Sequence, residues 1–150
     1  MTRILNESTI FKPEGIAKIE EIKNAKYVCE TCLRSKDGGW ANQPVAIFYG
    51  PEEHPVSKSR YFGIYLDMDD RVMITNGQSA VDEPIQGVVA DNDDIIYSRF
   101  RHDFRRSPDG SVFVDGGRDY FRGSVLPQER YVTLRIVDGE LVLEKKTEEA

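Results

Sequence analysis

The residues best suited to chemistry in this chain are arginines interleaved with aromatic residues between positions 94 and 123. Side chains of an extended strand alternate between its two faces, so residues 94–106 divide into an apolar and a cationic face. The apolar face carries Ile96, Ser98, Phe100, His102 and Phe104. The cationic face carries Tyr97, Arg99, Arg101, Asp103 and Arg105. A guanidinium fork matches the oxygens of a phosphate or a carboxylate, so the second face is suited to an anion.

A second segment repeats this chemistry. Arg118, Tyr120 and Arg122 share one side of a strand that we expect over residues 118–122. If the two strands pair with these faces together, they form a platform on which a nucleotide base could stack. The candidate ligand-binding residues are Arg99, Arg101, Arg105, Arg118, Tyr120 and Arg122. The alternative is a polar strand face held by arginine–aspartate pairs across the strands.

Groups that could catalyse a reaction or hold a metal are few. His102, Asp103 and Asp115 could form a metal or acid–base cluster, but neighbours on a strand face opposite sides, so His102 and Asp103 would not converge. Cys29 and Cys32 form a Cys-x-x-Cys pair, which supplies at most two of the four ligands of a zinc site. We expect two reduced thiols in a hairpin, with half a zinc site as the alternative and redox catalysis third. We therefore predict no metal, no cofactor and no enzymatic activity.

Composition and charge restrict the class of protein. The 150 residues include 20 basic and 26 acidic side chains, which gives a net charge of −6, and 39% of the residues are hydrophobic. This composition suits one soluble domain with a core and is unsuited to general binding of nucleic-acid phosphates. No run approaches the roughly 20 apolar residues of a membrane helix, and residues 1–7 lack the apolar run of a signal peptide. Two cysteines are too few for a secreted disulfide scaffold, so we expect a cytoplasmic protein.

Charge is unevenly distributed along the chain. Residues 67–94 carry eight acidic residues and one arginine, whereas residues 97–123 carry six arginines and four aspartates. Adjacent strands with these charges neutralise each other, or they divide the surface so that one part attracts an anion. Closely spaced carboxylates also imitate the charge of a nucleic-acid backbone. An acidic inhibitor of a host enzyme, acting through Asp91, Asp93 and Asp94, is therefore an alternative function.

The elements that must position these residues are almost all strands. We expect strands where apolar or alternating segments are bounded by turn residues, over 45–49, 61–66, 72–75, 95–106, 111–114, 118–122, 131–137 and 140–144. The last two, joined by Asp138-Gly139, form the clearest hairpin. One short helix is expected from Pro13 to Asn24, because proline suits the first helical position and the isoleucines give an apolar face. These signals predict a single α+β domain over 1–150, mainly antiparallel β-sheet with hairpins and one short N-terminal helix, with 1–12 as an N-terminal arm and 145–150 as a frayed tail.

Two blocks of the sequence resemble a known family. The first is Asn24 to Cys32, which holds Asn-Ala and the Cys-x-x-Cys pair. The second holds His102-Asp103-Phe104 and then Val-Asp-Gly-Gly-Arg-Asp-Tyr from Val114 to Tyr120, followed by Arg122. Together they resemble small uncharacterised proteins of bacteria and their phages that look like zinc-ribbon units. This chain has 106–110 where the family has a second cysteine pair, and an insertion over 33–93, so the resemblance does not carry the family's zinc site. It implies a phage or mobile-element origin and a small accessory protein, and it supplies no catalytic residue.

These observations together predict a non-enzymatic accessory protein of phage origin, located in the host cytoplasm. It would bind a small anionic ligand, such as a nucleotide or cyclic nucleotide, and act as an anti-defence sponge that sequesters it. The alternatives are the acidic inhibitor of a host enzyme and a metal-dependent enzyme that uses His102, Asp103 and Asp115. The expected partner is the anionic ligand or a host protein. A homodimer with the arginine strands at its interface suits the nucleotide-binding hypothesis.

Overall fold

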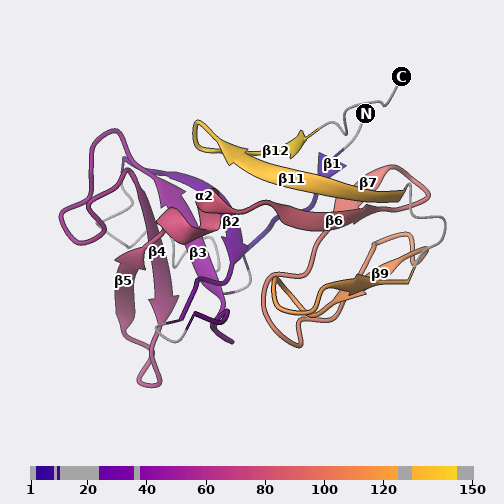
Figure 1. The fold of residues 1–150 in the computed structure, drawn as a ribbon, viewed down its shortest axis with the longest axis horizontal. Helices are drawn as coiled ribbons and strands as arrows, with labels where there is room; N and C mark the ends of the chain where they lie inside the picture. Colours follow the sequence, from indigo (N-terminus) through magenta and orange to yellow (C-terminus); the bar gives the residue numbers. More distant parts are fainter. Residues whose placement is uncertain (1–2, 9, 11–23, 36–37, 125–129, 145–150) are drawn as a thin grey trace.

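The computed structural model describes residues 3–8, 10, 24–35, 38–124 and 130–144, and these form a mainly β fold (Figure 1). Of the described part, 44% is strand and 5% is helical. The predicted α+β class is therefore wrong. The helix expected from Pro13 to Asn24 lies outside the described residues except for Asn24, as does the expected tail over 145–150. Helix α2 (Gln78–Asp82) is only five residues long and contributes one buried residue, Ala80.

No described helix has the length and apolar character needed to cross a membrane.

The first sheet contains four antiparallel strands in the order of the chain. They are β2 (Lys26–Thr31), β3 (Val45–Tyr49), β4 (Tyr61–Leu66) and β5 (Val72–Asn76). β3 and β4 are rich in the β-branched and aromatic residues that strands favour, and Gly50-Pro51 follows β3 directly. The predicted strand over 45–49 and the hairpin between 61 and 75 are confirmed.

The second sheet contains five strands, in the order β1, β7, β6, β11, β12. Their bounds are β1 (Arg3–Ile4), β7 (Asp94–Ile96), β6 (Ile85–Val89), β11 (Tyr131–Val137) and β12 (Glu140–Glu144). The predicted β11–β12 hairpin is confirmed. Asp138 and Gly139 have φ angles of 50° and 79°, the left-handed conformation that tight hairpins require. β1 pairs in parallel with β7, so part of the expected N-terminal arm is a strand of this sheet.

The third sheet is small and contains β8 (Arg105–Arg106), β9 (Phe113–Asp115) and β10 (Arg122–Gly123), with β9 in the middle. Two predicted strands are wrong here. The strand expected over 95–106 is interrupted after Ile96, because the chain turns at His102, whose φ is 67°. The strand expected over 118–122 reaches only Arg122, since the turn that begins at Gly116 and Gly117 occupies the preceding residues.

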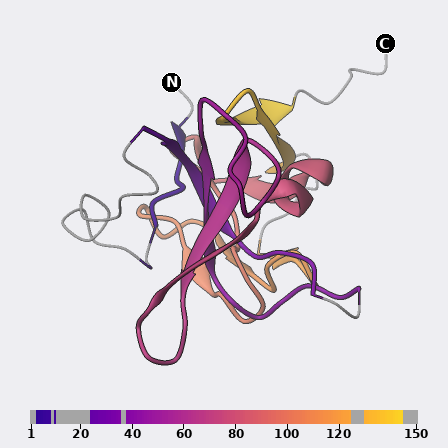
Figure 2. The ribbon, with the colours of Figure 1, turned by 90° about the vertical axis from the view of Figure 1, so that its left-hand side faces the viewer.

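Two layers of the described core lie between these sheets (Figures 1 and 2). A third cluster lies on the other face of the first sheet and contains Ala46, Phe48, Phe62 and Ile64. Between the first and second sheets lie Val28, Cys29, Leu33, Val45, Ile47, Ala80, Ile85, Ile95, Tyr97, Leu134 and Ile136. Between the second and third sheets lie Val88, Ala90, Ile96, Val112 and Val114. Consecutive residues of one strand serve different layers, because their side chains alternate. Ile95 and Ile96 show this directly.

Candidate functional site

A cavity of about 590 Å³ lies between the turn at 116–121 and the segment that follows α2. Its lining residues are Trp40, Glu83, Pro84, Gln86, Gly117, Arg118, Asp119, Tyr120 and Phe121. We call it the Trp40 cavity. Two of the residues predicted to bind a ligand, Arg118 and Tyr120, line it. An arginine beside a tyrosine ring is the combination that the sequence suggested for a flat anionic ligand.

In this cavity, no carboxylate among the described residues forms an ion pair with Arg118. Its guanidinium carbon lies 4.4 Å from the centre of the Trp40 ring, and it donates to the carbonyl oxygens of Ala80 (3.3 Å) and Glu83 (2.6 Å). Burial lowers the pKa of Arg118 below its usual value. Its Nε is buried and has no hydrogen-bond partner among the described residues. A partly buried cation loses some of its hydration, and an anionic group beside Arg118 would compensate for this loss.

The two carboxylates of the Trp40 cavity are each bound by a different arginine. The guanidinium of Arg34 lies 4.1 Å from the centre of the Trp40 ring and pairs with Glu83. Arg101 pairs with Asp119 at 3.3 Å. Neither acid therefore forms an ion pair with Arg118, and Glu83 acts on its charge only at longer range.

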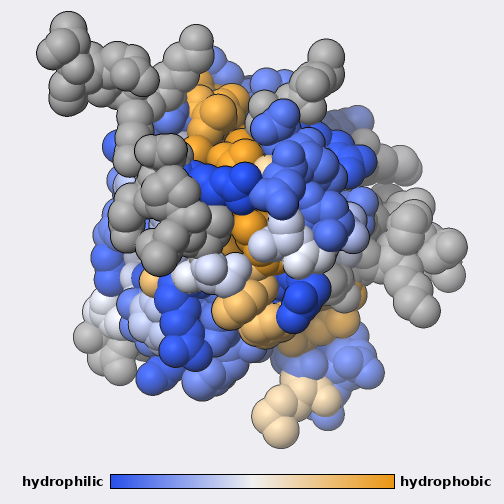
Figure 3. Space-filling view, turned by 90° about the vertical axis from the view of Figure 1, so that its right-hand side faces the viewer, coloured by the Kyte–Doolittle hydropathy of each residue, from blue (hydrophilic) through white to orange (hydrophobic). Residues whose placement is uncertain are grey.

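Cationic and aromatic side chains also surround the outer side of Tyr120. Its hydroxyl lies 2.9 Å from Nδ1 of His102, and the guanidinium carbon of Arg122 lies 5.7 Å from the centre of its ring. The side chains of Arg101 and Arg122 are 51% and 69% exposed, so both can reach a bound molecule. We call these two side chains the rim arginines. The side of the molecule that carries the third sheet is mostly hydrophilic, with an apolar strip across it (Figure 3).

Four of the six predicted ligand-binding residues lie together at the Trp40 cavity, and the other two make contacts elsewhere in the fold. Arg101, Arg118, Tyr120 and Arg122 lie in or beside the Trp40 cavity. Arg99 is 6% exposed, and Arg105 donates to the carbonyl oxygens of Leu5 (3.4 Å) and Tyr97 (3.2 Å). The paired-strand platform does not form, because residues 97–104 turn instead of continuing as a strand.

Arg99 serves the fold through a buried ion cluster. It donates to Asp103 through Nε (2.7 Å) and a terminal nitrogen (2.8 Å), and its other terminal nitrogen pairs with Glu30 of β2. Glu30 also accepts from the amide of Ile10 at 3.1 Å and from Ser8 at 3.2 Å. The cluster fixes the turn over 97–104 against β2, which in turn positions Arg101 and His102 beside the Trp40 cavity.

Cys29 and Cys32 are buried free thiols. Burial raises the pKa of Cys29 to about 12 and raises that of Cys32 as well. The thiolate is the form that attacks electrophiles or binds metals, so both residues are suited to packing. Within the described part of the chain, no group of three or more histidines, cysteines or carboxylates is placed to hold a metal ion.

The other predicted catalytic and acidic residues are dispersed. His102 is exposed rather than in the core, Asp103 is buried against Arg99, and Asp115 pairs with Arg122 at 3.1 Å. Asp67 and Asp69 lie in the turn between β4 and β5, whereas Asp91 and Asp93 lie in the turn between β6 and β7. These two turns lie at opposite ends of the molecule in Figure 1, so the acidic segment forms no continuous surface.

Three residues of the site were missed by sequence reasoning: Arg34, Trp40 and Glu83. The single tryptophan follows Asp37-Gly38-Gly39. This turn-forming segment suggests that Trp40 is partly exposed, but it does not predict which residues contact its ring. Arg34 and Trp40 approach each other through an isolated antiparallel bridge that closes this loop. Glu83 lies more than 40 residues further along the chain, so only the tertiary structure could place it here.

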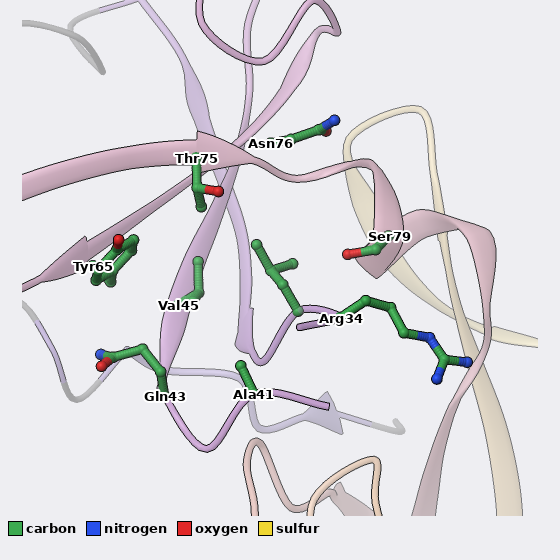
Figure 4. A pocket seen from close by; sticks show the side chains of 9 residues that line it. Arg34, Ala41, Gln43, Val45, Tyr65, Thr75, Asn76 and Ser79 are labelled. Carbon is green, nitrogen blue, oxygen red and sulfur yellow. The ribbon is translucent and has the colours of Figure 1, made fainter. Parts of the chain in front are cut away.

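A second cavity, of about 550 Å³, opens on the face of the first sheet (Figure 4). It is lined by Leu33, Arg34, Ala41, Gln43, Val45, Tyr65, Thr75, Asn76 and Ser79. Arg34 is the only charged residue among these, and its guanidinium points away from the cavity. We call this second cavity the Tyr65 cavity. Apart from Arg34, the lining of the Tyr65 cavity is uncharged, which distinguishes it from the Trp40 cavity.

Comparisons of the chain with family models, curated proteins and solved structures found no match. The resemblance to small zinc-ribbon-type proteins therefore stays a prediction.

Proposed function

We propose that this protein binds a small anionic ligand with a flat ring, of the nucleotide class, in the Trp40 cavity. The proposal is for binding without turnover, so the protein would sequester its ligand. The observation that carries the proposal is Arg118, a partly buried cation beside the indole ring of Trp40. Within the part of the chain that the structure describes, its side chain donates only to carbonyl oxygens. An anionic group at this position would supply the missing counter-charge.

Each part of the ligand has a matching group in the cavity. The ring of Tyr120 offers a face on which a base can stack, and stacking on aromatic residues tolerates different bases. The ring of Trp40 is already contacted by the guanidinium groups of Arg34 and Arg118, so it borders the ligand rather than carrying the base. Only two of the five N–H groups of Arg118 are used by Ala80 and Glu83, and the terminal nitrogens keep further donors for a phosphate. The rim arginines Arg101 and Arg122 can contact a second phosphate, since both are exposed.

Trp40 provides a direct measurement, because it is the only tryptophan in the chain. We would titrate the protein with ADP and follow tryptophan fluorescence, with pyrophosphate and adenosine as separate probes. ADP should change the emission in a saturable way. Pyrophosphate and adenosine should each bind more weakly than ADP, since each supplies only one half of the interaction. Absence of saturable binding of ADP and of pyrophosphate would overturn the proposal.

Two variants assign the binding to this cavity. Arg118→Gln should weaken ADP binding at least about tenfold, because a hydrogen bond between charged groups contributes about 1.5–3 kcal/mol. Arg71→Gln is the matched control, because Arg71 lies in the turn between β4 and β5, where it pairs with Asp67 at 3.0 Å. Equal loss in both variants would indicate a nonspecific charge effect and would contradict a site at Trp40.

A further inference from the structure

Strand β5 forms an outer edge of the first sheet and lacks the features that normally protect such an edge. Among the described residues it pairs only with β4, and no described element lies beyond it in Figures 1 and 2. Its sequence, Val72-Met73-Ile74-Thr75-Asn76, has no charged residue and no proline, and its register with β4 is regular. Val72 and Met73 are 42% and 38% exposed. An uncharged, regular edge of this kind is a template for another strand.

The register shows which backbone groups of β5 face outward. Hydrogen-bonded and non-hydrogen-bonded pairs alternate along an antiparallel ladder. The amide of Asp67 donates to the carbonyl of Arg71 and the amide of Gly77 donates to the carbonyl of Tyr61, so these two pairs bond to each other across the hairpin. By alternation, Met73 and Thr75 bond to β4. The amide and carbonyl groups of Val72, Ile74 and Asn76 therefore point away from the sheet.

We propose that β5 is the edge through which a second copy of this chain docks, as an antiparallel β5–β5 pair. One register uses every outward group. It places Ile74 opposite Ile74 of the second copy and Val72 opposite Asn76, and it follows a two-fold axis, the commonest symmetry of protein dimers. The two first sheets would then continue as one sheet across the interface. This proposal is independent of the ligand proposed for the Trp40 cavity.

The same register places side chains and charges favourably. Met73 would lie opposite the second copy's Thr75, which lines the Tyr65 cavity. Met73 and Thr75 share the face of the sheet that carries this cavity, because they pair with Tyr65 and Gly63 of β4. The flexible, uncharged Met73 side chain of each copy thus suits the edge of an uncharged cavity in the other. Asp70 falls opposite Gln78 of the second copy, so the acidic turns do not face each other.

The oligomeric state in solution tests the proposal. Sedimentation velocity of the full chain, from about 10 µM to about 1 mM, should show a monomer that converts to a dimer, since a short strand pair buries little area. Val72→Pro should abolish the dimer, because the Val72 amide faces outward and is not needed by β4. Val72→Lys should act in the same way and covers the case in which the proline variant does not fold. Val56→Lys is the control, since Val56 is 59% exposed and belongs to the connection between β3 and β4, outside the proposed β5–β5 pair.

The register has its own test. The variant Met73→Cys with Thr75→Cys should crosslink into a dimer on oxidation, because residues of a non-hydrogen-bonded pair lie within the distance of a disulfide. The native thiols are buried and would not compete. A monomer at every concentration, or a dimer that persists in both Val72 variants, would overturn the proposal. A dimer that forms no crosslink would overturn the register.

Discussion

The guanidinium of Arg118 lies 4.4 Å from the centre of the Trp40 ring, although the two residues are 78 positions apart in the chain. Arg118 makes no ion pair with any described residue, and its Nε is buried without a partner. Such a residue contributes little to stability, because its loss of hydration is only partly compensated by carbonyl oxygens. Groups that are costly to the fold are often retained for binding. This distinction between stability and binding can be measured.

Replacement of Arg118 should affect binding far more than stability. In Arg118→Met, an apolar side chain of similar length can pack on Trp40 without the cost of burying a charge. We expect the free energy of unfolding to change by less than about 1 kcal/mol, the range typical of weakly coupled residues, while ADP binding is lost. Urea denaturation and fluorescence titration of the same samples measure both. A loss of stability above about 3 kcal/mol would mean that Arg118 is structural.

Arg99 should behave in the opposite way. Arg99→Ala would leave the carboxylates of Glu30 and Asp103 buried without their guanidinium, which costs about 3–5 kcal/mol. Arg101→Ala, the control two residues away, removes a surface ion pair and should cost less than about 1 kcal/mol. Urea denaturation of the two variants gives the comparison. Similar costs for both would contradict the buried ion cluster as a determinant of the fold.

Gly117 should be irreplaceable, whereas Gly110 should tolerate a side chain. Both have positive φ, 57° and 75°. A Cβ on Gly117 would lie 2.4 Å from the carbonyl carbon of Phe100, but a Cβ on Gly110 would meet nothing within 4 Å. Gly110→Ala should therefore cost only the backbone strain of about 1–2 kcal/mol. Gly117→Ala should lower the free energy of unfolding by clearly more, because the added Cβ would push the turn at Gly117 away from the backbone of Phe100. Equal melting temperatures for the two variants would contradict this contact.

Asp109 should make stability depend on acid pH. Its carboxylate accepts hydrogen bonds from Ser107 (2.6 Å) and from the amide of Ser111 (3.0 Å), and these bonds hold its pKa below the usual range. A depressed folded pKa contributes stability that is present above the unfolded pKa of about 3.9 and is lost as the pH falls below it. Asp109→Asn should therefore show a shallower loss of stability between about pH 5 and pH 2. Parallel curves for wild type and variant would contradict this assignment.

The native thiols should be unreactive while the protein is folded. Burial raises the pKa of Cys29 to about 12, so very little thiolate exists near pH 8, and the side chain is also inaccessible. A thiol reagent at pH 8 should modify neither cysteine until denaturant is added. Met68→Cys provides the positive control, since Met68 is fully exposed in the turn between β4 and β5. Rapid modification of the folded wild type would instead point to an accessible cysteine pair.

Much of the strand framework was predictable from local sequence. The Asp138-Gly139 turn between two alternating segments encodes its hairpin without outside help, because only a few residue types adopt the required backbone angles. The run Val45 to Phe48 is continuously apolar, and it forms a strand that is buried on both faces. The α+β class failed because the one α-helix of the described residues is only five residues long. Most of the described core lies between sheets, an arrangement that alternation within one strand does not reveal.

The candidate site was only partly predictable. Its arginine and tyrosine chemistry was visible in residues 99–122, and four of the six residues lie in or beside the Trp40 cavity. The prediction that Arg99 lies on an exposed cationic strand face was wrong. That prediction assumes an extended chain, whereas hydrogen bonds from Arg99 to Asp103 hold this segment in a turn. A side-chain hydrogen bond to the local backbone competes with a strand, and its success depends on the surroundings.

Local sequence specifies the strands, the tight turns, and a group of cations with aromatic neighbours in an acidic chain. The packing of distant segments determines which of those cations are buried with carboxylates and which remain accessible to a ligand. The physical reason is that the cost of a charge depends on its partners and on its loss of water, and both are set by residues distant in the chain. Arg99 meets Glu30 and serves the fold, whereas Arg118 meets Trp40 and keeps its charge unpaired among the described residues.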